Sequence, residues 1–274
     1  MAGACAAPLT VPRFKLTIEY AGTRYSGWQI QKNATTIAGE IDRAVRTVTG
    51  RKDFELYGSG RTDAGVHASG QVAHLDVSTN LTPETLVQQL NTELPGDINI
   101  LAAVQVPHRF HARHHAVARR YLYQIARRKT SATGYTWWVR EKLDVARMRE
   151  AARAFVGMRD FKAFSVAAAR DEPDDAPPST VVLVDRLEII EDGELLLVSI
   201  QGSHFLWKMV RRMVGVLVEI GRGGMPPGAV GDMLAGGSSA PARLTAPSSG
   251  LFLERVYYEG EPQDEAPLPI RPLG

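Results

Sequence analysis

The chain has 274 residues, of which 44% are hydrophobic and 23% charged, with a net charge of +2 and a single cysteine, Cys5. One cysteine excludes a disulfide within the chain, and the lack of a run of about 20 apolar residues excludes a membrane-spanning helix. Residues 1–11 lack the charged start and long apolar core of a secretory signal. We therefore expect a globular protein of the cytoplasm that does not associate with a membrane.

The first half of the chain predicts strands that alternate with helices. Apolar residues alternating with other residues predict strands over four stretches: 14–20, 54–57, 73–77 and 98–106. Apolar residues at helical spacing predict a helix over 37–48, which Gly50 ends. A second helix is predicted from Pro83 to Leu90, because Thr82 supplies a cap before the first-turn proline.

The second half repeats this order of elements. Its predicted strands cover 119–125, 181–190, 194–201 and 251–258. Its predicted helices cover 145–155, before Gly157, and 205–220, before Gly221. Residues 167–179 form a predicted polar loop that contains prolines, and residues 260–274 a proline-rich tail.

Two similar halves of strands and helices predict an α+β protein. We expect long, mainly antiparallel sheets backed by helices, with a cleft between the halves that holds the active site. The expected organisation is a flexible N-terminus over 1–12, an N-terminal domain over 13–112, a C-terminal domain over 113–258 and a tail over 259–274.

Positive charge is concentrated in one window of the sequence. Between Asp97 and Glu141 there are eight lysines and arginines and no acidic residue, a local charge of +8. Aromatic residues lie in the same window, at Tyr121, Tyr123, Tyr135, Trp137 and Trp138. This mixture suits a phosphate backbone with unstacked bases, and a solvated basic face is the alternative.

The densest chemical motif is Gly-Ser-Gly-Arg-Thr-Asp-Ala-Gly-Val-His-Ala, residues 58–68. Glycines allow a backbone to approach another group closely, and this loop carries one carboxylate, Asp63, beside Arg61. The motif is not a Walker A loop, a dinucleotide fingerprint or a calcium loop, because the residues that each requires are missing. The alternatives are a catalytic loop and a tight turn with a structural aspartate.

A lone carboxylate such as Asp63 can serve as a nucleophile, a base or a metal ligand. Metal binding is disfavoured, because the loop has no second acid and the histidines of 108–115 fit no standard site. A nucleophilic aspartate needs an arginine partner to aim it. Arg211 and Arg212 lie on the predicted helix over 205–220, and one of them should border its buried face. The alternative is that this arginine only packs its apolar stem against the protein and extends its charged end into solvent.

The glycine motif resembles, almost letter for letter, the nucleophile motif of the TruA family of tRNA pseudouridine synthases. Further segments resemble motifs of this family in the same order, and together they cover residues 13–258: 20–29, 90–98, 110–113, 119–123, 205–215 and 246–251. The resemblance implies the pseudouridine synthase fold and an isomerase that converts uridine to pseudouridine. The chain departs from the family pattern at Pro247–Gly250, at 179–182 and in the acidic stretch 171–175. These departures bear on which uridines are modified more than on whether the protein is active.

The resemblance also implies roles for individual residues. Asp63 is the nucleophile, Tyr121 stacks on the extruded base and helps move a proton, and Arg211 pairs with Asp63 and supports base flipping. Leu251 packs against the target base. Further substrate contacts are assigned to Arg61, Thr62, His67, Arg113, Arg119 and Arg120.

The expected substrate is tRNA, modified at uridines 38, 39 and 40 of the anticodon stem-loop. We expect no cofactor and no metal, and a homodimer in which one tRNA contacts both subunits. Two other functions stay open at this point. One is a non-catalytic tRNA-binding or chaperone protein, which has no need of a carboxylate facing a polyanion. The other is a hydrolase with Asp63 as base, which lacks a second acid or a metal site.

Overall fold

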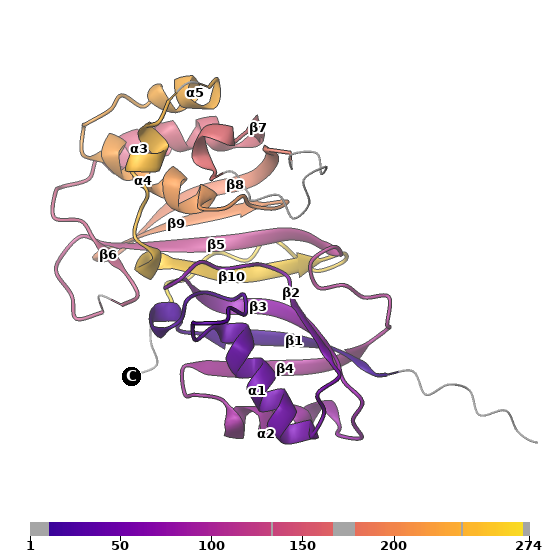
Figure 1. Ribbon diagram of the computed structural model, residues 1–274. Helices are drawn as coiled ribbons and strands as arrows, with labels where there is room; N and C mark the ends of the chain where they lie inside the picture. Colours follow the sequence, from indigo (N-terminus) through magenta and orange to yellow (C-terminus); the bar gives the residue numbers. More distant parts are fainter. Residues whose placement is uncertain (1–10, 133, 167–178, 237, 271–274) are drawn as a thin grey trace, which may run out of the picture.

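The protein is described here from a computed structural model that covers residues 11–132, 134–166, 179–236 and 238–270 (Figure 1). The predicted loop over 167–179, except for Ser179, lies outside these ranges, as do most of the N-terminus and the end of the tail. The strands are β1 (Arg13–Tyr20), β2 (Glu55–Gly58), β3 (His67–Asp76), β4 (Ile98–Val106), β5 (Ala116–Ala126), β6 (Trp137–Trp138), β7 (Gly157–Asp160), β8 (Val181–Asp192), β9 (Leu195–Gly202) and β10 (Leu251–Tyr258). The α-helices are α1 (Ile37–Thr49), α2 (Pro83–Glu93), α3 (Val145–Ala152), α4 (Met209–Gly221), α5 (Ala229–Leu234) and α6 (Ala240–Arg243).

One continuous sheet runs through both halves of the molecule, in the order β4-β1-β3-β10-β5-β9-β8-β7 (Figure 1). Each half contains a β-α-β-β-α-β unit with the same strand order: β4-β1-β3-β2 in the first and β10-β5-β9-β8 in the second, which also has the short elements β6, β7, α5 and α6. The two units meet where β10 pairs in parallel with β3, while β10 pairs antiparallel with β5. The predicted α+β class with two similar, mainly antiparallel halves is confirmed, and the sheets expected in the two halves join into one continuous sheet.

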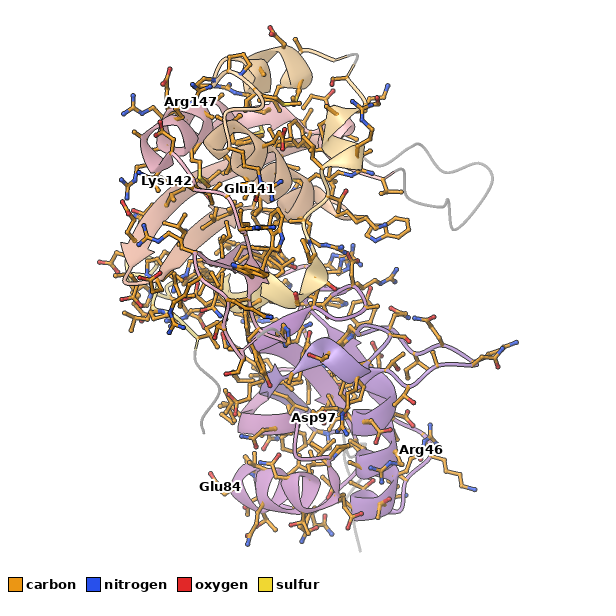
Figure 2. The ribbon with its side chains drawn as sticks, turned by 90° about the vertical axis from the view of Figure 1, so that its left-hand side faces the viewer. Arg46, Glu84, Asp97, Glu141, Lys142 and Arg147 are labelled. Carbon is orange, nitrogen blue, oxygen red and sulfur yellow. The ribbon has the colours of Figure 1, made fainter. Side chains whose placement is uncertain are left out.

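Two hydrophobic cores lie under the helices. One packs α1 and α2 against β1, β3 and β4, and the other packs α3 and α4 against β5, β8 and β9. Tyr121 on β5 touches both cores, so the two helical layers meet on the same face of the sheet beside this residue. Charged side chains point outward from the first two helices, as Arg46 on α1 and Glu84 on α2 do in Figure 2.

Local signals place the first two helices where the sequence predicts them. Thr36 caps α1 by accepting a hydrogen bond from the Gly39 N–H, and Gly50 ends the helix in a left-handed conformation, with φ of 67°. Thr82 caps α2 in the same way, by accepting from the Thr85 N–H. Both helices thus begin at a threonine whose side chain satisfies a backbone donor that the helix itself leaves free.

The long helix of the second half starts later than predicted. The apolar spacing predicts a start at Phe205, whereas α4 begins at Met209. Lys208 has a φ of 62°, a left-handed conformation that separates the turn before it from the helix. Phe205 and Leu206 still pack against the core, but from that turn, which is why their spacing resembles a helical one. The α-helix predicted over 145–155 ends at Ala152 and continues as a 3₁₀ turn.

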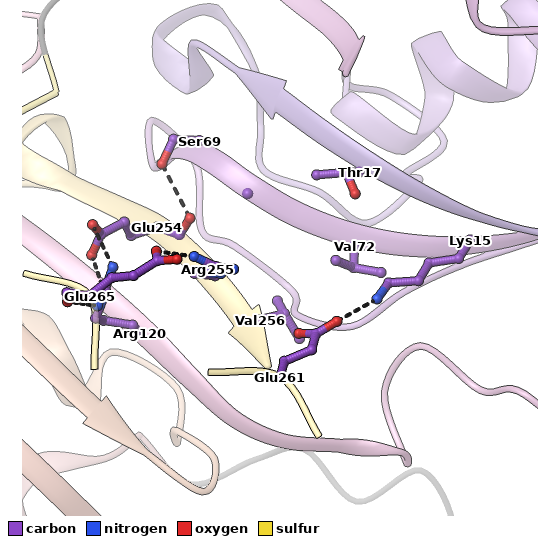
Figure 3. Close-up of a pocket in the computed structure, with 11 residues that line it drawn as sticks. Lys15, Thr17, Ser69, Val72, Arg120, Glu254, Arg255, Val256, Glu261 and Glu265 are labelled. Carbon is purple, nitrogen blue, oxygen red and sulfur yellow. Dashed lines mark hydrogen bonds and ion pairs between the residues drawn. The ribbon is translucent and has the colours of Figure 1, made fainter. Parts of the chain in front are cut away.

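The face of the sheet away from the helices is covered by the segment that follows β10. Glu261 pairs with Lys15 at 3.0 Å, and the Glu265 carbonyl oxygen accepts from Arg120 at 2.6 Å. A pocket of about 420 Å³ lies there (Figure 3), and the charges that line it are paired with one another. Lys15 alternates along β1 with core residues, so this pocket opens on the side opposite Tyr121.

Two buried histidines accept backbone hydrogen bonds and must therefore be neutral. Nδ1 of His67 accepts from the Gly22 N–H at 3.1 Å, and Nδ1 of His74 accepts from the Ala112 N–H at 3.2 Å. Burial lowers the pKa of both imidazoles, and the nearby Arg13 lowers the pKa of His74 further. A proton on either Nδ1 would replace an acceptor with a donor.

We predict that the free energy of unfolding is constant with pH just above neutrality and decreases as pH falls below about 6.5, the pKa of histidine in an unfolded chain. Stability decreases because His67 and His74 bind protons in the unfolded chain at this pH but stay neutral in the folded protein. Urea denaturation between pH 7.5 and 5.5 measures this. The variant His74→Asn keeps an acceptor near the Ala112 N–H and should lose stability less steeply. An equally steep loss would contradict the assignment to His74.

Candidate active site

The loop that carries Asp63 connects β2 to β3, over residues 59–66. The corresponding connection of the second half, between β8 and β9, is the two-residue turn Gly193–Glu194. The longer loop is fixed by Gln71, whose side chain accepts from the Gly60 N–H at 3.2 Å and donates to the Gly60 carbonyl oxygen at 2.8 Å. Its backbone is therefore held on the strand that follows it.

The segment before α1 supports the other side of this loop. The Trp28 N–H donates to the Thr62 carbonyl oxygen at 3.0 Å, and the Gly65 N–H to the Tyr25 carbonyl oxygen at 3.3 Å. Gly27 has a φ of +92°, and a Cβ there would lie 2.5 Å from the Thr62 oxygen. Glycine at this position is what allows the two backbones to touch. Asp63 thus stands on a loop whose main chain is bonded on both sides.

Asp63 is paired with Arg211 from the first turn of α4. Nη1 of Arg211 donates to a carboxylate oxygen of Asp63 at 3.2 Å, and Nε donates to the Ala246 carbonyl oxygen at 2.8 Å. The two side chains keep 16% and 21% of their surface accessible, so a ligand can reach the pair. The sequence left Arg211 and Arg212 undecided on periodicity alone; Arg212 instead donates to the Ser165 carbonyl oxygen.

The segment 244–248 positions Arg211 by packing directly on α4. The Ala246 N–H donates to the Arg211 carbonyl oxygen at 3.0 Å, so this residue bonds both the main chain and the side chain of Arg211. Gly215 makes the approach possible, because a Cβ there would lie 1.5 Å from the Leu244 oxygen. Sequence reasoning missed the part played by this segment. An isolated glycine inside an apolar helix is the one signal that could have indicated it.

Tyr121 lies beside this pair. Its ring contacts Phe205 edge-on, with centroids 5.1 Å apart. Burial raises the pKa of the Tyr121 phenol to about 12, with a smaller lowering by Arg119 and a further rise from Asp63. The phenol is therefore neutral at physiological pH and can donate a hydrogen bond. The structure brings together the three residues that the resemblance names, Asp63, Tyr121 and Arg211.

The remaining predicted contacts divide into exposed and structural residues. Arg61 is exposed, and within the described part of the chain its side chain has no hydrogen-bond or ion-pair partner. Thr62 is buried and hydrogen-bonds with the Tyr20 hydroxyl at 2.8 Å, and His67 is fully buried. Leu251 is also buried, at the start of β10. Thr62 and His67 therefore support the loop from beneath.

The three arginines of the basic window that the resemblance assigns to the substrate have different environments. Arg113 is exposed, and its side chain forms no ion pair among the residues described. Arg119 bridges separate segments, donating to the Ser203 oxygen at 2.9 Å and the Arg113 oxygen at 2.7 Å. The environment of Arg120 does not match the RNA contact that the resemblance implies. It is 5% exposed, pairs with Glu254 at 2.7 Å and lines the pocket on the opposite face, because neighbours on a strand point to opposite sides.

The arrangement as a whole suits covalent chemistry on a ligand that enters between the two halves. A carboxylate aimed by an arginine, with a neutral phenol beside it, combines a nucleophile or base with a proton donor. No group of three or more His, Cys, Asp or Glu side chains in the described ranges is arranged to hold a metal ion. Nor does any helix in these ranges have the length and apolarity needed to cross a membrane.

Comparison with known proteins places the chain in a family. The family model described as tRNA pseudouridine synthase matches residues 16–115 and 151–259. The tRNA pseudouridine synthase A of Syntrophotalea carbinolica is 43% identical over 253 residues, covering 91% of this chain and 97% of the relative. Those of Geotalea uraniireducens and Geobacter sulfurreducens are each 40% identical, covering 90% and 89% of this chain and 99% and 98% of the relatives. The chain belongs to the tRNA pseudouridine synthase family, and its enzymatic class is that of the isomerases.

We predict that Gly215→Ala lowers the free energy of unfolding by about 1–3 kcal/mol and reduces pseudouridine formation. The added methyl group meets the Leu244 oxygen, so the 244–248 segment must move, and the carbonyl group that holds Arg211 moves with it. Urea denaturation and an activity assay on tRNA measure the two effects.

Gly231→Ala is the matched control, since a Cβ at Gly231 on α5 meets nothing within 4 Å. An alanine there should leave activity unchanged and stabilise the protein by up to about 1 kcal/mol. Full activity and stability in Gly215→Ala would contradict the part given to the 244–248 segment.

Proposed function

We propose that this protein converts uridine to pseudouridine in the anticodon stem-loop of tRNA, with Asp63 as the nucleophile. The observation that carries the proposal is the pair of Asp63 and Arg211 at 3.2 Å, partly accessible and flanked by Tyr121. Membership of the family supports the reaction and the tRNA substrate. The positions within tRNA and the role of Asp63 go beyond that membership and are our proposal.

The reaction breaks the glycosidic bond between C1′ of the ribose and N1 of uracil, turns the base, and joins C1′ to C5. N1 gains a proton and C5 loses one, so the product is an isomer of the substrate and no electrons are gained or lost. The carboxylate of Asp63 can add either to the base or to the sugar carbon. In both routes Arg211 directs the carboxylate and offsets its charge beside the phosphates of RNA.

Tyr121 and Arg211 also suit the handling of an extruded base. A uridine in a stem becomes accessible only when it leaves the stack, which costs a few kcal/mol. The Tyr121 ring offers a surface for the base, and its neutral hydroxyl can donate to the base while a proton is transferred. Arg211 can fill part of the space from which the base has moved, because its guanidinium is held at the protein surface by Ala246.

Three finer features follow from the resemblance to the TruA family and complete the proposal. The modified uridines are those at positions 38, 39 and 40, the enzyme acts in the cytoplasm, and it works as a homodimer with one tRNA contacting both subunits. Sedimentation of the purified protein at micromolar concentration distinguishes the dimer from a monomer.

We predict that Asp63→Asn abolishes pseudouridine formation and leaves the affinity for tRNA within a few-fold of the original. The amide keeps the shape of the side chain and removes its nucleophilic charge. Mapping of pseudouridines in tRNA from cells with each variant tests both the residue and the positions 38–40. Asp232→Asn, on the exposed side of α5, is the matched control and should retain activity.

Turnover by Asp63→Asn would contradict the nucleophile assignment. Tight tRNA binding by the original protein without any pseudouridine would instead favour the non-catalytic tRNA-binding function.

We predict that Arg61→Gln and Arg113→Gln each weaken tRNA binding and reduce the slope of log affinity against log salt by about 1. Both side chains are exposed, and no carboxylate in the described ranges is paired with them, so they are available to phosphates. Filter binding over a range of salt concentrations measures the slope. Arg46→Gln is the control, because Arg46 already pairs with Asp42 on the outer side of α1. Unchanged slopes for both Arg61→Gln and Arg113→Gln would show that these two side chains do not contact the RNA.

A further inference from the structure

An exposed tryptophan stands in the turn between β9 and α4. Trp207 is 51% exposed, although it lies between core residues and the first turn of the helix. Its backbone is fixed, since its carbonyl oxygen accepts from the Val166 N–H at 3.1 Å. The neighbouring residues Phe205 and Leu206 pack against the core. The side chain is therefore held out toward solvent by a turn that is itself anchored.

The conformation of the next residue adds a cation to this ring. Lys208 has a φ of 62°, which is uncommon for a residue with a side chain, and its Nζ lies 5.3 Å from the centroid of the Trp207 ring. Lys208 forms no ion pair among the described residues. An aromatic face and an unpaired ammonium group are thus presented together at the protein surface.

Two arginines lie near the turn that carries this pair, since Arg119 donates to the Ser203 oxygen and to the Arg113 oxygen. His204, in the same turn, has its pKa lowered by burial and by Arg119 and Arg113, so both arginines act on this end of the molecule. Arg212, one turn into α4, donates only to a backbone oxygen, that of Ser165. The partner that fits such a surface is an anion with an aromatic part. An apolar protein surface would not match these charges.

The turn is also connected to the active site. Phe205 contacts the ring of Tyr121, with centroids 5.1 Å apart. Arg211, which holds Asp63, lies in the first turn of α4, four residues after Trp207 in the chain. A nucleotide on Trp207 would therefore be close to the nucleotide at Asp63.

We propose that Trp207 and Lys208 form a stacking site for an unpaired nucleotide of the substrate RNA, close to the uridine held at Asp63. The base stacks on the indole ring and Lys208 contacts its phosphate. This inference rests on the proposed function for the identity of the RNA. It adds a binding site outside the group of Asp63, Tyr121 and Arg211.

The test is a cycle of protein and RNA variants, read out as binding. Trp207→Ala should weaken binding of an anticodon stem-loop RNA by roughly 5- to 150-fold, the range for loss of one stacked base. Trp207→Phe keeps an aromatic face and should bind within a few-fold of the original. RNAs in which each loop nucleotide in turn is made abasic identify the partner. At one position the abasic change should weaken binding to the original protein and have little further effect on Trp207→Ala.

Tryptophan fluorescence gives a second measurement that does not depend on the stability of the alanine variant. The chain has four tryptophans, and stacking on Trp207 should quench emission when RNA is added. The quenching should be lost in Trp207→Phe and kept in Trp138→Phe. Trp138 is the matched control because it is 41% exposed and lies on β6, outside the turn.

Unchanged affinity in Trp207→Ala, or unchanged quenching in Trp207→Phe, would overturn the inference. Neither result would affect the proposed function, which is decided by pseudouridine formation in the original protein and in Asp63→Asn. Conversely, a protein that binds the RNA through Trp207 and forms no pseudouridine would refute the proposed function and leave the stacking site in place.

Discussion

Asp63 and Arg211 lie 148 residues apart in the chain, on a loop of one half of the molecule and a helix of the other, and their contact at 3.2 Å defines the site. An ion pair that is partly open to solvent contributes about 1 kcal/mol or less, too little to hold two halves together. The pair must instead be imposed by the scaffold. Strand β10 does this, because it pairs with β3 just beyond the Asp63 loop and with β5 beside Tyr121. The segment before β10 also fixes Arg211 through Ala246.

The scaffold is repeated but the site is not. Both halves have the β-α-β-β-α-β order, yet the hairpin connection of the first is the loop 59–66 and that of the second is the turn Gly193–Glu194. The longer connection provides room for a carboxylate and for bonds from Gln71 and Trp28 that hold it. The repeat thus supplies a rigid junction, and one elaborated loop supplies the carboxylate of the candidate site on a supported backbone.

The two faces of the sheet have separate roles. The face with the helices carries Tyr121 and the pair of Asp63 and Arg211, where the two cores meet. The other face is closed by the segment after β10, whose Glu261 pairs with Lys15, while Glu254 on β10 itself pairs with Arg120. Positive charge therefore stays unpaired beside the site and is cancelled behind it. A chain with a net charge of only +2 can in this way keep arginines such as Arg61 and Arg113 exposed and without an ion-pair partner among the described residues.

The sequence by itself determined the class of the fold and indicated Asp63 as the candidate reactive residue. Alternation in strands, the threonine caps of α1 and α2, and the glycine motif around Asp63 are local signals, and local structure follows from them. Family resemblance added Tyr121 and Arg211, which periodicity alone could not separate from their neighbours.

Only the tertiary structure decided which basic residues face the site. Arg119 and Arg120 are adjacent in sequence, yet the pleat of β5 sends them to different surroundings, and Glu254, far along the chain, neutralises the second. The start of α4 depended likewise on the left-handed Lys208, and with it the exposure of Trp207. These features depend on contacts between distant segments, so no window of the sequence contains them.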